Sequence, residues 1–438
     1  MRWQADAMRT ALRVVLLGAL PAAALAQADR SPTEAASAGD RNLFQSDMTL
    51  MNGMVPVEPM AGMRMPWHLM DVGVATGGYD SQGGPSGGQE GDSINWNMLH
   101  LEGSLGPGLL SVMMMNSLEV LTFPKEGSHE LFQTGETYQG RPLVDRQHPH
   151  DFFMNLSATY RYPLGAEAGV WLQVAPVGEP AIGPTAYMHR ASSGENHTAP
   201  LSHHWQDSTH ISFNVITVGG GWRWLALDAS VFHGQEPDSN RWNIDGGAID
   251  SASGRLRLLL PDGWSGQVSY AFLKHPEPEE PGDLHRLSAS ISYGAAGGRP
   301  LAVSLIWGRN IESAAPTSDS VLLESAWQIT ALDQVYGRAE WVQKDEFLLR
   351  TKHFPPPGLP VRLAGVAAFT AGYFRDFRLV RGLDTGVGGD VTLYAFPREL
   401  EVAYGKSPVS GHVFARLRWG RAALIEMESM PAMHHHPM

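Results

Sequence analysis

The chain has 438 residues, no cysteine and a formal net charge of −13 at pH 7. This acidic balance disfavours nucleic acid as a partner and is compatible with the attraction of cations. Because there is no cysteine, the chain has neither disulfides nor thiolate ligands, and a soft metal ion could bind only through thioether and imidazole groups.

The first segment has the pattern of a secretory signal peptide. Three arginines precede an apolar run at residues 14–20, and Ala24 and Ala26 offer small residues for cleavage. We therefore predict a signal peptide over residues 1–26, too short to cross a bilayer as a helix. No later apolar run reaches about 18 residues, which argues against a helical membrane protein.

Residues 27–66 are predicted to form a periplasmic segment rich in methionine. Thioether sulfur suits Cu(I), and imidazole suits Cu(II), Zn(II) or Ni(II), so a mixed segment can bind copper in either redox state. The alternative is that methionine is a pliable apolar filler that packs against the lumen or a partner. The candidate metal ligands here are Met48, Met51, Met54, Met60, Met63 and Met65, accompanied by His68 just beyond the segment.

From residue 67 to 420 the chain repeats stretches of roughly ten residues in which apolar and polar side chains alternate, the signature of a transmembrane antiparallel β-barrel. Arg416 and Arg418, for example, alternate with apolar neighbours that we expect to face lipid. We predict about 16 strands, within a range of 14–18. They are placed at 67–76, 94–104, 109–118, 153–161, 168–176, 209–218, 222–233, 252–260, 264–272, 285–293, 301–310, 321–330, 334–343, 363–375, 384–395 and 411–420.

The connections between strands alternate between short and long, as in outer-membrane barrels with short periplasmic turns and longer outer loops. An even number of strands places both chain ends on the periplasmic side. A soluble all-β sandwich is the alternative, and the aromatic residues near many strand ends argue against it. The short turns are predicted at 105–108, 163–165, 219–220, 261–263 and 332–333, and the long loops at 77–93, 119–152, 177–208, 235–251, 273–284, 311–320, 345–362 and 396–410.

Two of the long loops carry histidine motifs. The candidate metal ligands in them are His148, His150, His203, His204 and His210. If the second motif is extended, His203 and His204 point to opposite sides and only one joins a given site. The alternative is that Asp145, Arg146, His148 and Asp151 form a hydrogen-bonded network that fixes an inward-folded loop to the barrel wall. Either arrangement would make this region the gate of the pore.

The motifs DRQHPHD at 145–151 and LSHHWQDSTH at 201–210 resemble those of a family of bacterial outer-membrane β-barrel proteins associated with metal handling. The resemblance implies a barrel fold and a role with metal ions, without a mechanism. The joining of a methionine-rich amino-terminal segment to a barrel is also similar in design to copper-resistance outer-membrane protein B.

The last segment, residues 421–438, is predicted to be a periplasmic tail rich in methionine and histidine. An exposed tail has no core to fill, so its side chains favour metal binding; a purification tag is the alternative. The candidate ligands are Met433, His434, His435 and His436.

Together these patterns predict a non-enzymatic outer-membrane barrel for binding, transport or resistance of a metal ion, foremost copper. Its partners would be outer-membrane lipid and metal ions, with a homo-oligomer or a periplasmic metal-handling protein left open. One rival is a general or solute-specific porin with a structural histidine loop. The other is a lipid hydrolase using Ser202 with His203 and Asp207, or Ser157 beside His150 and Asp151, although no Gly-x-Ser-x-Gly turn supports it.

Overall fold

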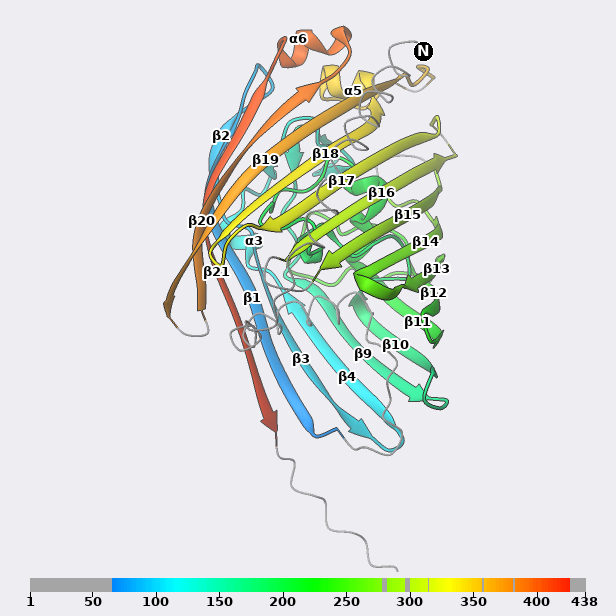
Figure 1. The fold of residues 1–438 in the computed structure, drawn as a ribbon. Helices are drawn as coiled ribbons and strands as arrows, with labels where there is room; N and C mark the ends of the chain where they lie inside the picture. Colours follow the sequence, from blue (N-terminus) through cyan, green and yellow to red (C-terminus); the bar gives the residue numbers. More distant parts are fainter. Residues whose placement is uncertain are drawn as a thin grey trace, which may run out of the picture.

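The computed structural model describes residues 65–277, 282–295, 300–313, 315–356, 358–380 and 383–425. Within these ranges, sixteen long strands form one antiparallel sheet that closes into a barrel (Figure 1). Each strand pairs with the next along the chain, and the last pairs with the first from Trp67↔Ile425 to Gln82↔Ser410. The predicted transmembrane barrel of 16 strands is confirmed. The chain enters the first strand and leaves the last strand at the same end of the barrel, because Trp67 pairs with Ile425.

The barrel strands differ in length, so one side of the wall is taller than the other (Figure 1). The strands are β1 (Trp67–Gln82), β3 (Asn95–Leu105), β4 (Gly108–Asn116), β9 (Phe153–Pro163), β10 (Ala168–Gly178), β11 (Ser212–Trp222), β12 (Leu225–His233), β13 (Ser251–Leu259), β14 (Trp264–Leu273), β15 (Leu284–Ala295), β16 (Leu301–Glu312), β17 (Ser318–Gln328), β18 (Asp333–Asp345), β19 (Leu363–Val380), β20 (Leu383–Ala395) and β21 (Val409–Ile425).

Side chains alternate between an apolar exterior and a polar lumen. On β21, Val413 is 68% exposed, whereas Arg416 on the opposite face is 3% exposed. An apolar exterior and a polar interior invert the arrangement of a soluble protein, so the sandwich alternative is wrong. Exposed aromatic side chains gather at the end with short connections, where a membrane interface would lie. They are Tyr162, Trp222, Trp224, Trp264 and Trp327.

The short turn predicted at Gly219 and Gly220 is wrong. Both residues lie inside β11, which continues to Trp222, and the turn is at Arg223 and Trp224. A Cβ at Gly219 would lie 2.2 Å from ring atoms of Trp171 on β10. Glycine is therefore required here for close packing against an aromatic ring within the sheet.

Two predicted boundaries also shift. The predicted loop 77–93 instead begins with six more residues of β1, and β2 (Gln89–Asp92) pairs back onto them as a hairpin. At the other end of the chain, β21 continues to Ile425, beyond the predicted barrel boundary at 420. Gly77 and Gly78 interrupt the apolar alternation, but the ladder continues because β21 pairs with both.

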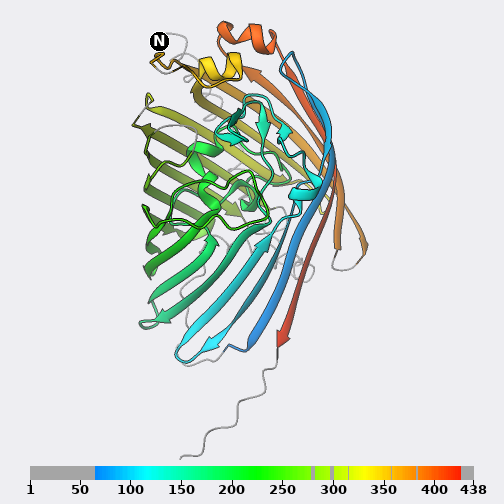
Figure 2. The same cartoon turned by 180° about the vertical axis from the view of Figure 1, so that it is seen from behind.

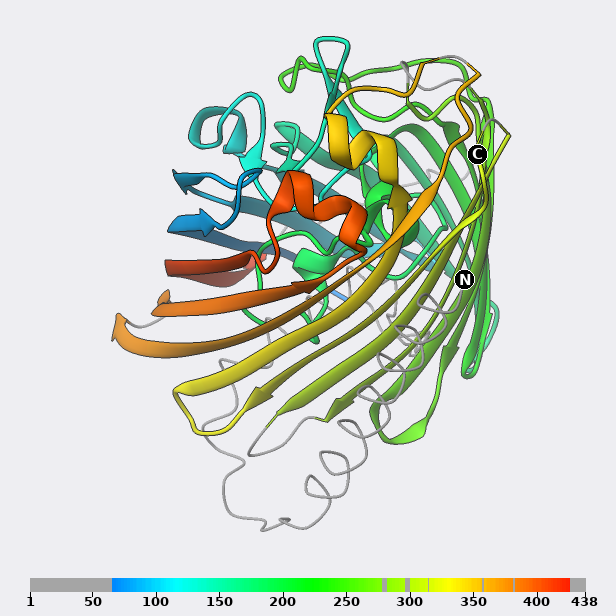
Figure 3. The ribbon, with the colours of Figure 1, turned by 90° about the horizontal axis from the view of Figure 1, so that it is seen from above.

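Two long connections fold into the barrel, as the sequence predicted for a loop that constricts the pore (Figures 2 and 3). We call them the plug loops: residues 117–152 between β4 and β9, and residues 179–211 between β10 and β11. The first contains α3 (Glu119–Thr122), β5 (Ser128–His129), β6 (Glu136–Tyr138), β7 (Arg141–Leu143) and β8 (Arg146–Gln147). The second contains η1 (Tyr187–His189), α4 (His203–Gln206) and η2 (Ser208–His210).

The plug loops are held by an apolar core inside the barrel. Leu131 and Phe132 of the first loop and Trp205 of the second are buried with Val366 of the wall and Tyr404 at the mouth. The rings of Phe132 and Tyr404 stack with their centroids 3.9 Å apart. This packing anchors both plug loops to the wall at β18 and β19.

Short helices lie at the mouth of the barrel (Figure 3). They are α5 (Glu346–Thr351), η4 (Arg398–Leu400) and α6 (Glu401–Tyr404), while η3 (Pro261–Gly263) forms a turn at the opposite end. Among the described residues no helix is both long and apolar enough to cross a membrane, a finding that says nothing of a β-barrel.

Candidate metal centre inside the barrel

The two histidine motifs meet inside the barrel. Their five histidines follow one another in space: the ring centroids are 6.1 Å apart for His148 and His150, 5.5 Å for His150 and His210, 5.3 Å for His210 and His203, and 5.3 Å for His203 and His204. All are buried except His210, which is half-buried. The structure thus brings together five histidines from two plug loops, although His150 and His203 are 53 positions apart in sequence.

The prediction that only one of His203 and His204 can join the site assumed an extended backbone, and it is wrong. The two residues begin the short helix α4. The helical backbone places both imidazoles inside the cluster, with a T-shaped contact between the rings.

Three of these histidines have their Nδ1 atoms held by an oxygen. His150 Nδ1 is 2.8 Å from Glu119 Oε2, His203 Nδ1 is 2.7 Å from Asp207 Oδ1, and His210 Nδ1 is 2.9 Å from the Asp207 carbonyl oxygen. Donation from Nδ1–H leaves the lone pair on Nε2, which is the tautomer that metal-binding histidines adopt. The Nε2 atoms of His150 and His210 are buried without a hydrogen-bond partner.

The most compact set of potential ligand atoms lies at His204. Glu136, His204 and Glu236 each offer one atom, and these atoms all lie within 4.8 Å of one another. His204 Nε2 is 3.7 Å from Glu136 Oε1, and His204 Nδ1 is 3.8 Å from Glu236 Oε2. Within the part of the chain that the structure describes, this is the one such set of three.

His148 is in direct contact with this set, because its Nδ1 lies 2.5 Å from Glu136 Oε1. The two carboxylates were not predicted. Glu136 lies on β6 in the first plug loop, and Glu236 lies in the connection between β12 and β13. Three separate loops therefore contribute to the cluster, and no spacing in the sequence relates them.

Burial shifts the protonation of this cluster toward neutral forms. Desolvation raises the pKa of Glu136 well above its ordinary value, although Arg241 opposes the shift, and desolvation also raises the pKa of Glu236. The pKa values of His148 and His204 are lowered well below normal by the same burial. A bound cation would favour the ionised carboxylates and the neutral imidazoles, so metal binding would release protons.

A buried ion pair is one of the contacts that fix the second plug loop to the wall. Arg190 donates to Glu324 of β17, with Nε 2.6 Å from Oε1, and to Asp207 in its own loop. Burial alone would raise the pKa of Asp207, but Arg190 and His203 hold it below its ordinary value. Asp207 is therefore an ionised carboxylate that can accept the hydrogen bond from His203 Nδ1–H.

The alternative network around Asp145, Arg146, His148 and Asp151 is present with other partners. Asp145 pairs with Lys352 near α5, Arg146 donates to the carbonyl of Gly127 at 2.6 Å, and Asp151 accepts from Arg241 at 3.1 Å. The contacts of Asp145 and Asp151 join the first plug loop to other loops, whereas the contact of Arg146 lies within that loop. The first plug loop reaches the wall through other residues, since Gln133 accepts from Lys344 of β18 at 3.2 Å and Leu131 N–H donates to Gln82 of β1 at 3.2 Å.

The other predicted ligands lie elsewhere. Met65 is at the edge of the barrel, where its backbone N–H donates to Ser104. His68 is on β1, with Nε2 4.0 Å from Glu102 Oε1, at the end of the barrel with short connections. The remaining candidates lie outside the described residues: Met48, Met51, Met54, Met60, Met63, Met433, His434, His435 and His436.

The residues named for lipid hydrolysis are not arranged as nucleophile, base and orienter. Ser202 Oγ is buried without a hydrogen bond, and Ser157 Oγ donates to Asn155 Oδ1 at 2.7 Å. A serine–histidine contact does occur elsewhere, at 2.5 Å between Ser111 Oγ and His100 Nε2, but His100 Nδ1 has no partner to orient the ring.

No family model matches this chain, and no curated protein matches it. Three solved structures resemble it in outline. The anion-selective porin from Comamonas acidovorans is 12% identical with a TM-score of 0.48, covering 81% of this chain and 100% of that chain. Salmonella typhi OmpF in complex with daunomycin is 9% identical with a TM-score of 0.49, covering 82% and 100%.

The third is Pseudomonas putida OprB, which is 10% identical with a TM-score of 0.48 and covers 81% of this chain and 94% of that chain. Similarities this low carry nothing about what the present chain binds. The functional argument therefore depends on the chemistry of its own lumen.

Proposed function

We propose that this chain is a bacterial outer-membrane barrel that binds a divalent transition-metal cation inside its lumen and controls the passage of that ion. The observation that carries the proposal is the meeting of Glu136, His204 and Glu236 inside the barrel, with potential ligand atoms within 4.8 Å of one another. Three carboxylate and imidazole ligands plus water make a complete coordination shell for such an ion.

The ligand chemistry supports an ion of intermediate softness. Imidazole suits Cu(II), Zn(II), Ni(II) and Fe(II). Because carboxylate is a hard ligand, a site with two carboxylates does not prefer the soft ion Cu(I). The methionine-rich segments would supply the thioether ligands that Cu(I) prefers. Copper is therefore the ion that the chain as a whole favours, with Cu(II) in the lumen and Cu(I) on the terminal segments.

The location follows from the signal sequence and the apolar exterior of the barrel. In this proposal the short connections and both chain ends face the periplasm, and the plug loops enter from the outer side. A periplasmic metal-handling protein, or a second copy of this chain, would be the partner at the inner side.

The porin alternative is weaker because of what fills the lumen. A general porin needs a wide aqueous pore, whereas the plug loops fold into this barrel, and Leu131, Phe132 and Trp205 pack there against the wall at β18 and β19. A solute-specific porin would still need the plug loops to move.

Metal binding by the folded, purified protein tests the proposal. The double substitution Glu136→Gln and Glu236→Gln keeps the size of both side chains but removes the anionic ligands. We expect Zn²⁺ or Cu²⁺ affinity at the lumen site to fall at least tenfold, with an unchanged barrel. Glu167→Gln, at an exposed residue paired with Arg223, is the matched control. Equal stoichiometry and affinity in the double variant would refute the site.

A further inference from the structure

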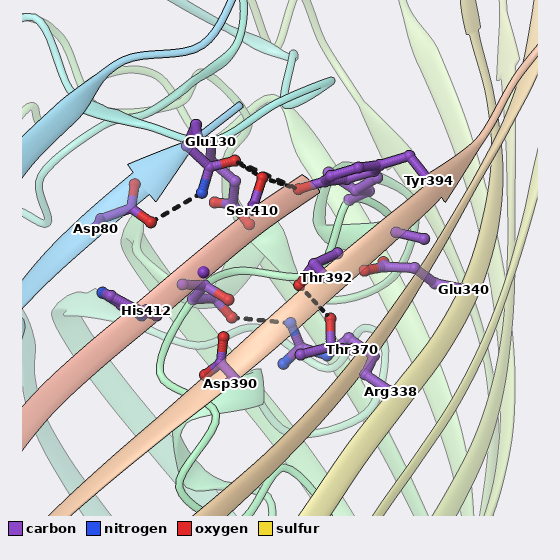
Figure 4. A pocket seen from close by; sticks show the side chains of 15 residues that line it. Asp80, Glu130, Arg338, Glu340, Thr370, Asp390, Thr392, Tyr394, Ser410 and His412 are labelled. Carbon is purple, nitrogen blue, oxygen red and sulfur yellow. Dashed lines mark hydrogen bonds between the residues drawn. The ribbon is translucent and has the colours of Figure 1, made fainter. Parts of the chain in front are cut away.

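Buried carboxylates occur at more than one place in the lumen, but they do not all form a metal site. A cavity beside β20 and β21 is lined by acidic side chains and one imidazole (Figure 4), and these residues are Asp80, Glu130, Glu340, Asp390 and His412. Among the described residues, only Glu136, His204 and Glu236 place three potential ligand atoms within 4.8 Å of one another. The way in which the carboxylates of this set are held therefore deserves a physical explanation.

Arg241 divides the two oxygens of Glu136 between different partners. Arg241 Nη2 donates to Glu136 Oε2 at 3.4 Å. Glu136 Oε1 lies on the side of the imidazoles, 2.5 Å from His148 Nδ1 and 3.7 Å from His204 Nε2. The side chains of Arg241 and Glu136 are only 9% and 12% exposed, so water competes little for these contacts. Glu136 thus presents one oxygen to the site, while a guanidinium occupies the other.

Arg241 is itself fixed by the end of the first plug loop. Its Nη1 donates to Asp151 Oδ1 at 3.1 Å, and its backbone carbonyl accepts from the N–H of Phe152 at 2.8 Å. The adjacent ring of Trp242 stacks on Phe152, with the ring centroids 5.4 Å apart. Because a guanidinium donates through separate nitrogens in a rigid plane, the bond to Asp151 sets the direction in which Nη2 meets Glu136.

The second carboxylate of the site is held in a similar way by a weaker donor. Ser208 Oγ lies 3.4 Å from Glu236 Oε1, and Glu236 Oε2 faces His204 Nδ1 at 3.8 Å. One imidazole and two single oxygens suit an ion such as Zn²⁺, which completes a tetrahedron with water. Ca²⁺ instead takes about six to eight oxygen ligands and uses bidentate carboxylates to reach that number.

We infer that Arg241 determines the ion specificity of the lumen site. By occupying Glu136 Oε2 it keeps this carboxylate monodentate, and the site then favours Zn²⁺-like ions over Ca²⁺. Arg241 touches no ion, so it acts as a positioning residue. The inference rests on the proposed function and adds the selectivity of the same site. One connection, between β12 and β13, thus supplies both the ligand Glu236 and the residue that orients Glu136.

The positive charge of Arg241, taken alone, predicts a different result. A nearby charge opposes the binding of Zn²⁺ and Ca²⁺ to a similar degree, because both ions carry the same charge. Loss of the charge would raise both affinities together. Release of Glu136 Oε2 raises the Ca²⁺ affinity more, because Ca²⁺ takes more oxygen ligands than Zn²⁺ does. The ratio of the two affinities separates the two effects.

Binding of Zn²⁺, Ca²⁺ and Co²⁺ to the full mature chain, folded in detergent, tests the inference. Arg241→Met removes both donors and keeps an unbranched side chain. We expect the ratio of Zn²⁺ to Ca²⁺ affinity to fall by about tenfold or more. The visible absorption of bound Co²⁺ should also weaken, since tetrahedral Co²⁺ absorbs far more strongly than six-coordinate Co²⁺. Arg161→Met, which removes the ion pair with Glu102 on the wall, is the matched control and should change neither readout.

The parent protein supplies a second test that needs no variant. Its Co²⁺ complex should show tetrahedral absorption, and excess Ca²⁺ should not displace Zn²⁺. The heat-dependent mobility of the barrel on SDS gels verifies folding. The inference is overturned if folded Arg241→Met keeps the affinity ratio and the Co²⁺ spectrum of the parent, or if Ca²⁺ displaces Zn²⁺ from the parent. Either result leaves the site at His204 standing. If the double variant Glu136→Gln and Glu236→Gln binds Zn²⁺ as the parent does, the site is refuted and this inference with it.

Discussion

Replacement of Arg190 by methionine should loosen the second plug loop at its central attachment to the barrel wall. Arg190 is bidentate on Glu324, with Nε–Oε1 at 2.6 Å and Nη2–Oε2 at 3.3 Å, and it also binds Asp207 and the carbonyl of Thr185. The side chains are 5%, 1% and 0% exposed for Arg190, Glu324 and Asp207. Methionine fills a similar volume but leaves both carboxylates without this cation.

The magnitude follows from the burial of the two carboxylates. Removing one partner of a buried ion pair costs about 3–5 kcal/mol, because an uncompensated charge remains in a poorly solvated site. Arg338, 3.8 Å from Glu324, offsets part of that cost. At about 1.4 kcal/mol per factor of ten, even 3 kcal/mol favours opening of this attachment by about a hundredfold, while Arg416–Glu195 and Arg338–Thr198 still hold the rest of the loop.

Conductance of single barrels in planar bilayers, with liposome swelling in small sugars, measures the effect. We expect the parent barrel to be nearly closed and Arg190→Met to show frequent openings. Arg223→Met is the matched control, because Arg223 and Glu167 are both more than half exposed and such a pair contributes at most about 1 kcal/mol. If a folded Arg190→Met barrel conducts no better than Arg223→Met, this ion pair does not hold the plug.

Three further outcomes are expected. Gly219→Leu should lower the urea midpoint of unfolding by the equivalent of about 1–3 kcal/mol or more, since the added Cβ would lie 2.2 Å from a tryptophan ring. Gly220→Ala is the control and should be tolerated, because its added Cβ would meet no atom closer than 3.6 Å. Equal midpoints for the two variants would contradict the packing argument. Because burial raises the pKa of Glu136, the affinity of the lumen site for Zn²⁺ should weaken as the pH falls below that raised pKa. Binding should also release protons, which calorimetry in buffers of different ionisation enthalpy measures; a binding enthalpy that is the same in every buffer would contradict this prediction. Deleting residues 41–64 and 427–438 should remove Cu(I) binding but keep the lumen Cu²⁺ site. The first deletion stops before β1, which begins at residue 67. An unchanged Cu(I) stoichiometry would contradict the assignment of Cu(I) to the methionine thioethers.

The alternating pattern of the sequence determined the barrel. A strand that crosses lipid must place apolar side chains outward at every second position, so Val413 and Arg416 could be assigned to opposite faces without coordinates. The same requirement gave the strand number and the sorting of short and long connections. It failed at Gly219, where glycine serves close packing in a strand, because spacing alone does not distinguish that role from a turn.

The sequence also marked the histidine motifs, but only the tertiary structure decided how they are used. Contacts within the lumen depend on the paths of irregular loops, and such paths have no periodicity to read. Glu136 and Glu236 reach His204 from loops a hundred residues apart, and His197 meets His412 across 215 residues. Each meeting is set by the closure of the barrel around the plug loops, which confines polar side chains to a small space where they must find partners.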